Sequence, residues 1–317
     1  MAVIRPKHWA QGMKITPGWY DIPADVYHAR QAGWPITLNS SALSRIVNQS
    51  PLHAYDMHSQ LGGRNRKAGS EMDFGTIAHS LILGKGRDIV ILDFPDFRST
   101  AAKVARDEVR ANGQTPVLKD KMQQPIALAQ AFKDRVMASD ARGFYAVNGF
   151  SEGDTDDPFG ESKIEGHCEV AGVVELDGVM CQILLDKIVV TPDFAIIYDI
   201  KTTTSAHPKA VAAKIANMGY DIQQEFYTRC TEALLPHYAG RVQFVFLFIE
   251  SASPYALLPV KLSGTGCAIA ASKVERGLAI WADCLKSGEW PGYGHGICAI
   301  DPPPWAISAE MEEGLYI

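Results

Sequence analysis

Residues 181–203, CQILLDKIVVTPDFAIIYDIKTT, contain the pattern that decides the fold. Two apolar runs flank residues 191–194 (TPDF), a tight turn with proline at its second position. Apolar runs of strand length on both sides of such a turn predict an antiparallel hairpin. If the turn closes symmetrically, Asp186 on the first strand lies directly opposite Asp199 on the second, with Cβ atoms about 4.5–5.5 Å apart. The sequence therefore predicts two carboxylates that face one another in an apolar hairpin.

This pair of carboxylates has a lysine beside it, because Lys201 is two residues past Asp199 and lies on the same face of the strand. Two like charges on half-buried strands are unfavourable, and a divalent cation between them reverses the sign of that interaction. A lysine beside such a cation can hold or polarise a water molecule, so the layout suits metal-assisted attack on a phosphodiester. The simpler alternative is that these residues form surface ion pairs, which stabilise a protein little.

Three other places in the chain offer candidates for the same site. Glu169 lies on the preceding strand candidate and could add a third carboxylate, with Glu175 as its rival. His79 lies in an apolar helix, where it is either a metal ligand or a core histidine with one hydrogen bond. Gln223 and Tyr227 are four residues apart on one helix face, which marks either a site or merely an amphipathic boundary.

Hydrophobic periodicity and turn residues predict helices first and a mixture of strands and helices after residue 167, with Asp177-Gly178 as a tight hairpin signal. Pro125 either kinks the helix around it or marks its true start. This order favours an α/β (α+β) fold, a small mixed sheet with helices packed on it. Helices are predicted over 40–50, then to about residue 60, from 73 or 75 to 84, and over 100–112, 119–139, 208–218, 220–235 and 265–286. Strands are predicted over 168–176, 179–190, 195–201, 241–250 and 255–262.

The predicted organisation is one main domain with a segment on either side. Residues 1–38, rich in Trp, Tyr, Pro and Gly, are predicted to be irregular, and residues 291–317 to form a surface tail. The main domain, 39–290, is predicted to divide into a helical part, an acidic linker and a sheet core, which comprise 39–150, 151–166 and 167–290 respectively.

Composition excludes several classes of protein. Hydrophobic residues make up 47% of the 317, but no apolar run reaches the roughly 18–20 residues that a membrane helix needs. The N-terminus has no apolar signal-peptide core, and the six cysteines form no CxxC pair, which argues against a disulfide framework or a zinc knuckle and favours a reducing cytosol. Gly84-Lys85 lacks the spacing of a phosphate loop, so no ATP is expected.

The net charge of −6 argues at first against nucleic acid, but the acidic residues are segregated. Residues 151–178 contain nine acidic residues and one lysine, and the chain after Trp290 contains four acidic residues and no lysine or arginine. The remainder is net positive and can present a basic face to phosphates, although solvated acidic loops explain the pattern equally well. The candidate DNA-binding residues are Arg64, Arg66 and Lys67 in a glycine-flanked loop, and Lys209 and Lys214 after the second hairpin strand.

Several segments resemble the RecE-type exonucleases (exonuclease VIII) of the PD-(D/E)XK nuclease superfamily. The hairpin matches through Leu185-Asp186 and through Asp199-Ile200-Lys201, and the matching segments together span nearly the whole chain. They are YDIPADVYHA (20–29), FGTIAHSLILG (74–84), CQILLDKI (181–188), YDIKTT (198–203), YDIQQEFYTR (220–229), FVFLFIES (244–251), WADCLKSGEWPGY (281–293) and PPWA (303–306).

The resemblance implies a restriction-endonuclease-like fold and 5′→3′ digestion of double-stranded DNA ends, which leaves a 3′ single strand for an annealing protein. It implies a homo-oligomeric ring, typically a tetramer, in the cytoplasm of a bacterial host cell, encoded by a phage or prophage. Lys201 would orient the attacking water and stabilise charge on the phosphate, and Gln223 and Tyr227 would match the family's QxxxY helix. One or two Mg²⁺ ions, for which Mn²⁺ can substitute, would be held by His79, Glu169, Asp186 and Asp199, with the backbone carbonyl of Ile200 as a further candidate.

The chain also departs from the family pattern. Leu184-Leu185 replaces the usual Arg-Pro, which removes a cation from the strand face shared with Asp186 and puts phosphate handling in doubt. The spacing of the last three cysteines does not fit the iron–sulfur nucleases of this fold, so no cluster is expected. We expect no counterpart of the long N-terminal extension of some relatives, and we expect Met13 to be an alternative start to Met1. An endonuclease of the same fold, or a catalytically decayed DNA-end-binding protein, remains an alternative.

Overall fold

The structure, a computed structural model, describes residues 4–29, 34–63, 70–138, 165–294 and 296–314. Its centre is a seven-stranded mixed sheet in the order β1-β2-β5-β6-β7-β8-β9. β1 is parallel to β2 and β7 is parallel to β8, whereas the other neighbouring strands are antiparallel. The strands are β1 (Lys7–His8), β2 (Gly18–Asp21), β5 (Glu165–Leu176), β6 (Val179–Val190), β7 (Ala195–Thr203), β8 (Val242–Glu250) and β9 (Leu257–Val260).

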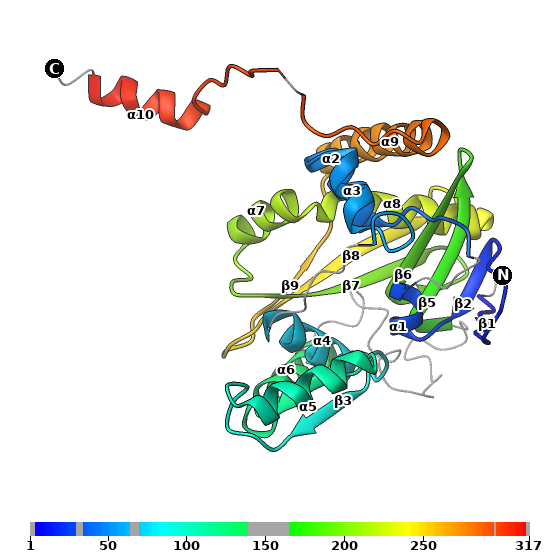
Figure 1. The fold of residues 1–317 in the computed structure, drawn as a ribbon, viewed down its shortest axis with the longest axis vertical. Coiled ribbons are helices and arrows are strands. Elements are labelled where there is room, and N and C mark those ends of the chain that lie inside the picture. The colour runs from blue at the N-terminus through cyan, green and yellow to red at the C-terminus, as the bar shows by residue number, and fades with distance from the viewer. Residues whose placement is uncertain (1–3, 30–33, 64–69, 139–164, 295, 315–317) are drawn as a thin grey trace.

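Helices cover both faces of this sheet, so the fold is the predicted mixed α/β arrangement (Figure 1). On one face lie α2 (Ser40–Asn48), α3 (Pro51–Met57), α8 (Tyr220–Leu234) and α9 (Gly264–Ser287), with α7 (Pro208–Met218) at their side. On the other face lie α4 (Ser70–Leu83) and α6 (Gln123–Ala138).

The apolar core is therefore double, with one cluster on each face of the sheet. Phe226 of α8 and Trp281 of α9 belong to the first cluster, and Phe132 of α6 belongs to the second. β8 contributes Phe246 to the first and Leu247 to the second, so it is buried on both faces. Burial of one such side chain stabilises the fold by about 1.5–3 kcal/mol. Because β8 is held from both sides in this way, it fixes the position of β7, the strand with which it pairs.

The hairpin of β6 and β7 has the predicted register. Lys187 pairs with Tyr198 and Val190 with Ala195, which is the pairing expected from a symmetric turn. The ladder ends at Lys187, so Asp186 and Asp199, the next pair in this register, lie where the two strands separate.

The preceding hairpin of β5 and β6 is also as predicted. Asp177 and Gly178 at its turn have φ angles of 49° and 79°. Two successive positive φ angles give the turn type whose twist matches that of antiparallel strands.

Some elements were not predicted. β2 pairs with β5 and brings residues 18–21 into the main sheet, and α1 (Ala24–Ala29) follows it. A second sheet joins β3 (Ile89–Leu92) to β4 (Thr115–Leu118), in parallel, on either side of α5 (Thr100–Ala111). Strands of two to four residues are too short to show an alternating pattern, which explains why the sequence did not predict them.

The predicted helix over 119–139 is wrong at its start. A 3₁₀ turn covers Lys119–Lys121, and α6 begins only at Gln123. Pro125 therefore lies in the first helical turn, where its missing N–H costs no hydrogen bond, and it does not kink the helix.

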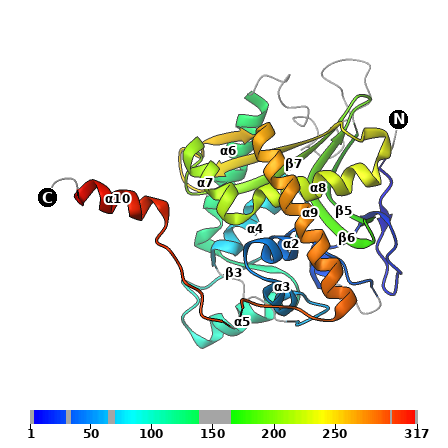
Figure 2. The same ribbon diagram turned by 90° about the horizontal axis from the view of Figure 1, so that it is seen from above.

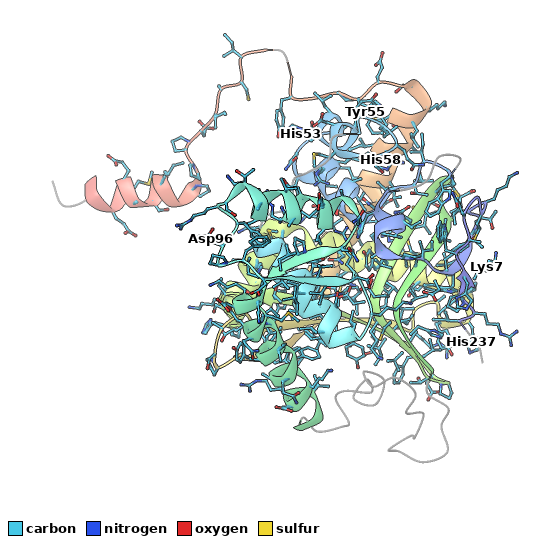
Figure 3. All side chains as sticks on the ribbon, turned by 60° about the horizontal axis from the view of Figure 1, so that its bottom comes forward. Lys7, His53, Tyr55, His58, Asp96 and His237 are labelled. Atoms are coloured by element: carbon cyan, nitrogen blue, oxygen red, sulfur yellow. The ribbon has the colours of Figure 1, made fainter. Side chains whose placement is uncertain are left out.

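The chain after α9 returns over α3 and then leaves the body of the molecule. Figure 3 labels Tyr55 of α3 and His58, the residue that directly follows this helix. Tyr55 contacts Trp290 and His58 contacts Trp281 of α9, with ring centroids 5.4 Å apart in each pair. The last helix, α10 (Pro304–Gly314), projects away from all other elements, as the view from above shows clearly (Figure 2). Of the helices described, none has the length and apolar character needed to cross a bilayer.

Candidate metal centre and active-site groove

A cluster of three polar side chains lies between α4 and the main sheet. His79 of α4 contacts Asp186 of β6 through Nε2 (2.8 Å to Oδ2) and Glu169 of β5 through Nδ1 (3.3 Å to Oε1). One ligand atom from each of the three residues lies within 4.8 Å of the others. The structure thus brings together three of the four side chains expected to bind metal. Glu175, the rival of Glu169, is exposed near the far end of the hairpin, where it pairs with Met180.

The backbone of β5 is distorted at Glu169. Its φ angle of 48° lies in the left-handed region, which costs a non-glycine residue about 1–3 kcal/mol. The pairs on either side of it, Cys168 with Lys187 and Val170 with Leu185, are regular, whereas Glu169 itself makes no ladder pair. Strain of this kind persists only where surrounding structure holds it, and here it coincides with the carboxylate cluster.

Asp199 lies beside this cluster with its carboxylate turned toward other partners. Its Oδ2 is 2.6 Å from Nζ of Lys201, and its Oδ1 accepts a hydrogen bond of 2.8 Å from Nε2 of Gln223 on α8. Within the described residues the compact cluster contains His79 but not Asp199, so a metal-ligand role for Asp199 stays a prediction.

The separation of β6 and β7 leaves a backbone amide for the site. The amide of Ile200 donates to Oδ2 of Asp186 at 2.7 Å, in the position where a strand carbonyl would otherwise accept. This bond and the one from His79 hold the same oxygen of Asp186. The structure gives a contact for the amide of Ile200, and the expected role of its carbonyl stays a prediction.

Burial and neighbouring charges shift the pKa values of the whole group. Burial alone would lower the pKa of His79, but the carboxylates of Asp186 and Glu169 raise it to about 9. Burial raises the pKa of Glu169 to about 7 and that of Asp199 to about 6, against the opposing pull of His79 and Lys201 respectively. Although burial alone would lower the pKa of Lys201, Asp199 and Asp186 raise it above its ordinary value, so the amine stays charged.

These shifts describe a site that requires positive charge. Protonated His79 lies between two carboxylates, which is where a cation would otherwise balance them. An imidazole and two carboxylates within one small cluster form a donor set that suits a divalent metal ion. The residues present therefore fit a divalent metal ion of the kind that the resemblance implies.

The cluster opens into a groove of about 710 Å³ that also passes the N-terminal end of α2. Tyr227, a predicted site residue, lines this groove, although it is only 8% exposed and packs in the first core cluster. Burial raises its pKa to about 12, so its hydroxyl stays protonated, and it shares a hydrogen bond with Ser40. Tyr220, three residues before Gln223, places its ring 4.8 Å from Nζ of Lys201.

The predicted DNA-binding residues are placed in part. Lys214 of α7 donates from Nζ to the carbonyl of Thr202 at 3.0 Å and lies close enough to Lys201 for the two charges to interact. Lys209 is exposed in the first turn of α7. Arg64, Arg66 and Lys67 lie outside the described residues.

Tyr220 and Arg87 are among the groove residues that the sequence did not single out. Tyr220 could have been found, because it is one helical turn before Gln223 and on the same face. Arg87 lines the groove from the loop after α4, where no periodic pattern could have revealed it.

Comparisons with known proteins agree with this fold. No curated protein matches the chain. A crystal structure described as a "putative exonuclease" from Eubacterium rectale superposes with a TM-score of 0.52 at 13% identity, covering 90% of this chain and 95% of that one. A second structure, of SSO0001, gives a TM-score of only 0.31 at 10% identity over 84% and 83% of the two chains, too low to inform the fold. Residues 45–301 match the model of the "PDDEXK-like domain of unknown function (DUF3799)" family, and the chain therefore belongs to this family of PDDEXK-like domains.

Proposed function

We propose that this protein is a metal-dependent deoxyribonuclease that hydrolyses phosphodiester bonds. The observation that carries the proposal is the arrangement of Glu169, Asp186 and Asp199 on three adjacent strands, with His79 on one side and Lys201 on the other. The description of the structurally similar protein from Eubacterium rectale as a "putative exonuclease" supports the same reading.

Each residue of the site has a role in this proposal. His79, Glu169 and Asp186 would hold the divalent cation, which supplies Lewis-acid polarisation of the phosphate and neutralises developing charge. Lys201 keeps its positive charge and is held in place by Asp199, so it can orient the attacking water and stabilise the phosphate. Gln223 fixes the other oxygen of Asp199, which orients the Asp199–Lys201 pair as a unit.

The finer proposal is 5′→3′ digestion of double-stranded DNA ends, which leaves 3′ overhangs for a single-strand annealing protein. It rests on the resemblance of segments 74–84, 181–188 and 220–229 to RecE-type exonucleases, three segments that all contribute residues to the groove. An endonuclease of the same fold would use the same side chains and differ only in the path of the DNA, so cleavage of a closed circular duplex distinguishes the two.

The test compares linear and covalently closed circular duplexes, each incubated with Mg²⁺, with Mn²⁺, with Ca²⁺ and with EDTA. We expect digestion of the linear duplex only, with Mg²⁺ or Mn²⁺ and not with Ca²⁺ or EDTA, and release of label from the 5′ end before the 3′ end. Cleavage of the closed circle would identify an endonuclease, and robust cleavage in EDTA would exclude the metal-dependent mechanism. Binding of DNA without cleavage under any condition would identify a decayed end-binding protein.

Site-directed variants tie the activity to this site. Asp186→Asn should abolish cleavage, because it removes the carboxylate that contacts both His79 and the amide of Ile200. Asp193→Asn is the matched control, since Asp193 is exposed in the turn of the same hairpin, away from the cluster. Equal loss of activity in both variants would point to the hairpin fold and not to the site.

We also propose that the protein works as a homo-oligomeric ring, for which a tetramer is the expectation. Support comes from the segregated charge and from the segment after α9, which projects from the body of the molecule (Figure 2). In this segment Ile297, Ile300 and Met311 are exposed, and its acidic residues are not accompanied by basic ones. Light scattering at working concentration tests this proposal. A strict monomer that still digests long DNA processively would contradict it.

A further inference from the structure

The groove contains a cation that the catalytic roles above do not use. Lys201 is paired with Asp199, and Lys85, in the hollow next to the groove, is paired with Asp21 at 2.6 Å. Arg87 lines the groove and is half-buried, yet among the described residues its guanidinium takes part in no hydrogen bond or ion pair. An arginine held at a groove wall without a protein partner has its hydrogen-bond donors available for a ligand.

The backbone fixes where Arg87 stands. Gly86 before it has a φ angle of 134°, and a Cβ there would lie 2.6 Å from Oγ of Ser80, so only glycine fits. The hydroxyl of Ser80 donates to the carbonyl of Arg87 at 3.4 Å. The next residue, Asp88, accepts a hydrogen bond of 2.8 Å from the amide of Thr115 at the start of the small sheet. Arg87 is thus attached on both sides to ordered elements.

The chemistry of the groove defines what this guanidinium can bind. The groove floor carries the carboxylates of Glu169, Asp186 and Asp199, and the strand position next to them is Leu184, which offers no charge. The metal ion and Lys201 are assigned to the phosphate that is cleaved, so a neighbouring phosphate of the same strand would draw its positive charge from another element. A guanidinium presents a planar fork that matches two oxygens of a phosphate, whereas an ammonium acts as a single point charge.

We propose that Arg87 binds a backbone phosphate of the DNA strand that lies in the groove. The inference rests on the proposed nuclease function and deepens it, because it names a strand-positioning contact on the wall contributed by the loop after α4. This contact supplies from Arg87 the positive charge that Leu184 does not provide on the hairpin.

Binding measurements test the contact directly. A short fluorescent DNA duplex is titrated by anisotropy at several salt concentrations, with Ca²⁺ in place of Mg²⁺ so that the DNA stays intact. Arg87→Gln should weaken binding about tenfold, as expected for loss of hydrogen bonds to a charged group, and should reduce the salt slope by about one. Arg87→Lys should fall between the wild type and Arg87→Gln, because lysine keeps the charge and loses the fork.

The matched control is Arg98→Gln in the loop before α5. Arg98 lies outside the groove, its side chain is 92% exposed, and its contact is with Asp96. Arg98→Gln removes the same charge as Arg87→Gln from a nearby part of the chain. Equal weakening of DNA binding in both variants would therefore show a general effect of charge and overturn the inference. Thermal melting of all variants checks that each one is folded. If Arg87→Gln does not fold, Arg87→Lys still tests the contact.

A second measurement identifies the phosphate. Neutral methylphosphonates are placed one at a time along one strand of the duplex. One position should weaken binding by the wild type about tenfold and leave binding by Arg87→Gln unchanged, since the partner of that phosphate is already missing. If every position affects both proteins equally, Arg87 makes no phosphate contact.

The outcomes separate this inference from the function on which it rests. A wild type that binds and cleaves DNA, together with an Arg87→Gln variant that matches it in affinity and salt slope, overturns the inference alone. A wild type that neither binds nor cleaves DNA overturns both.

Discussion

The Glu169→Gln variant is expected to be more stable than the wild type without metal and less responsive to metal. In the metal-free protein, burial raises the pKa of Glu169 from 4.5 to about 7, and only 8% of the side chain is exposed, so solvent screens this shift little. One pKa unit corresponds to about 1.4 kcal/mol, so the ionised carboxylate lowers the free energy of unfolding by about 3 kcal/mol at pH 8. Glutamine cannot ionise, and the variant should recover about 2–3 kcal/mol of this.

The gain in stability of Glu169→Gln over the wild type should depend on pH. A carboxyl whose pKa is raised on folding stabilises the folded state below its unfolded pKa of 4.5, and this contribution is lost as the pH rises through 7. The advantage of Glu169→Gln should therefore shrink to below about 1 kcal/mol at pH 5, where the folded wild type is already protonated.

The assay is urea unfolding followed by circular dichroism, in EDTA and again with millimolar Mn²⁺. Mn²⁺ should stabilise the wild type, because a ligand that binds only the folded state shifts the unfolding equilibrium, and should stabilise the variant much less. Glu175→Gln on the same strand is the control, since Glu175 is exposed. A Glu169→Gln variant less stable than the wild type at pH 8 in EDTA would refute the reasoning from buried charge.

Three further predictions follow from the same contacts. Mn²⁺ affinity measured by calorimetry should rise up to tenfold per pH unit between about pH 7 and 9. The reason is that Mn²⁺ must displace the proton that His79 holds with a pKa of about 9. An affinity that does not change with pH would exclude His79 as a ligand. His79→Ala should strongly reduce cleavage with little loss of stability, whereas unfolding with full activity in the residual folded protein would identify a core histidine. Tyr220→Leu should lower the rate of cleavage several-fold, because it removes a cation–π contact with Lys201 that contributes about 0.5–2 kcal/mol. Tyr220→Phe should keep the rate, because the ring and not the hydroxyl faces the amine.

The central hairpin could be predicted from the sequence because local rules determine it. The length of the turn at 191–194 fixes which residues pair, and the apolar alternation fixes which face they share, so the register of Asp186 and Asp199 followed without tertiary information. The positions of Gln223 and Lys201 were predictable for the same reason, since each depends only on spacing within one element.

Other parts of the site depend on contacts between elements that are distant in the sequence, so no local sequence pattern reveals them. The left-handed backbone at Glu169 breaks the preference of a non-glycine residue, so sequence could place Glu169 on a strand but not choose it over Glu175. Arg87 reaches the groove because α4 and the small β3–β4 sheet hold its loop, and that sheet was itself not predicted.

The two carboxylate environments explain how one small site can both hold a cation and keep a charged lysine. His79 contacts Glu169 and Asp186 on the side of α4, while Gln223 and Lys201 contact Asp199 on the side of α8. The strands separate between these two groups, so a metal ion bound in the first group need not displace Lys201 from Asp199 in the second. A change that closes the gap between β6 and β7 should therefore cost activity even if every side chain is kept, because the amide of Ile200 would return to the strand ladder and release Asp186.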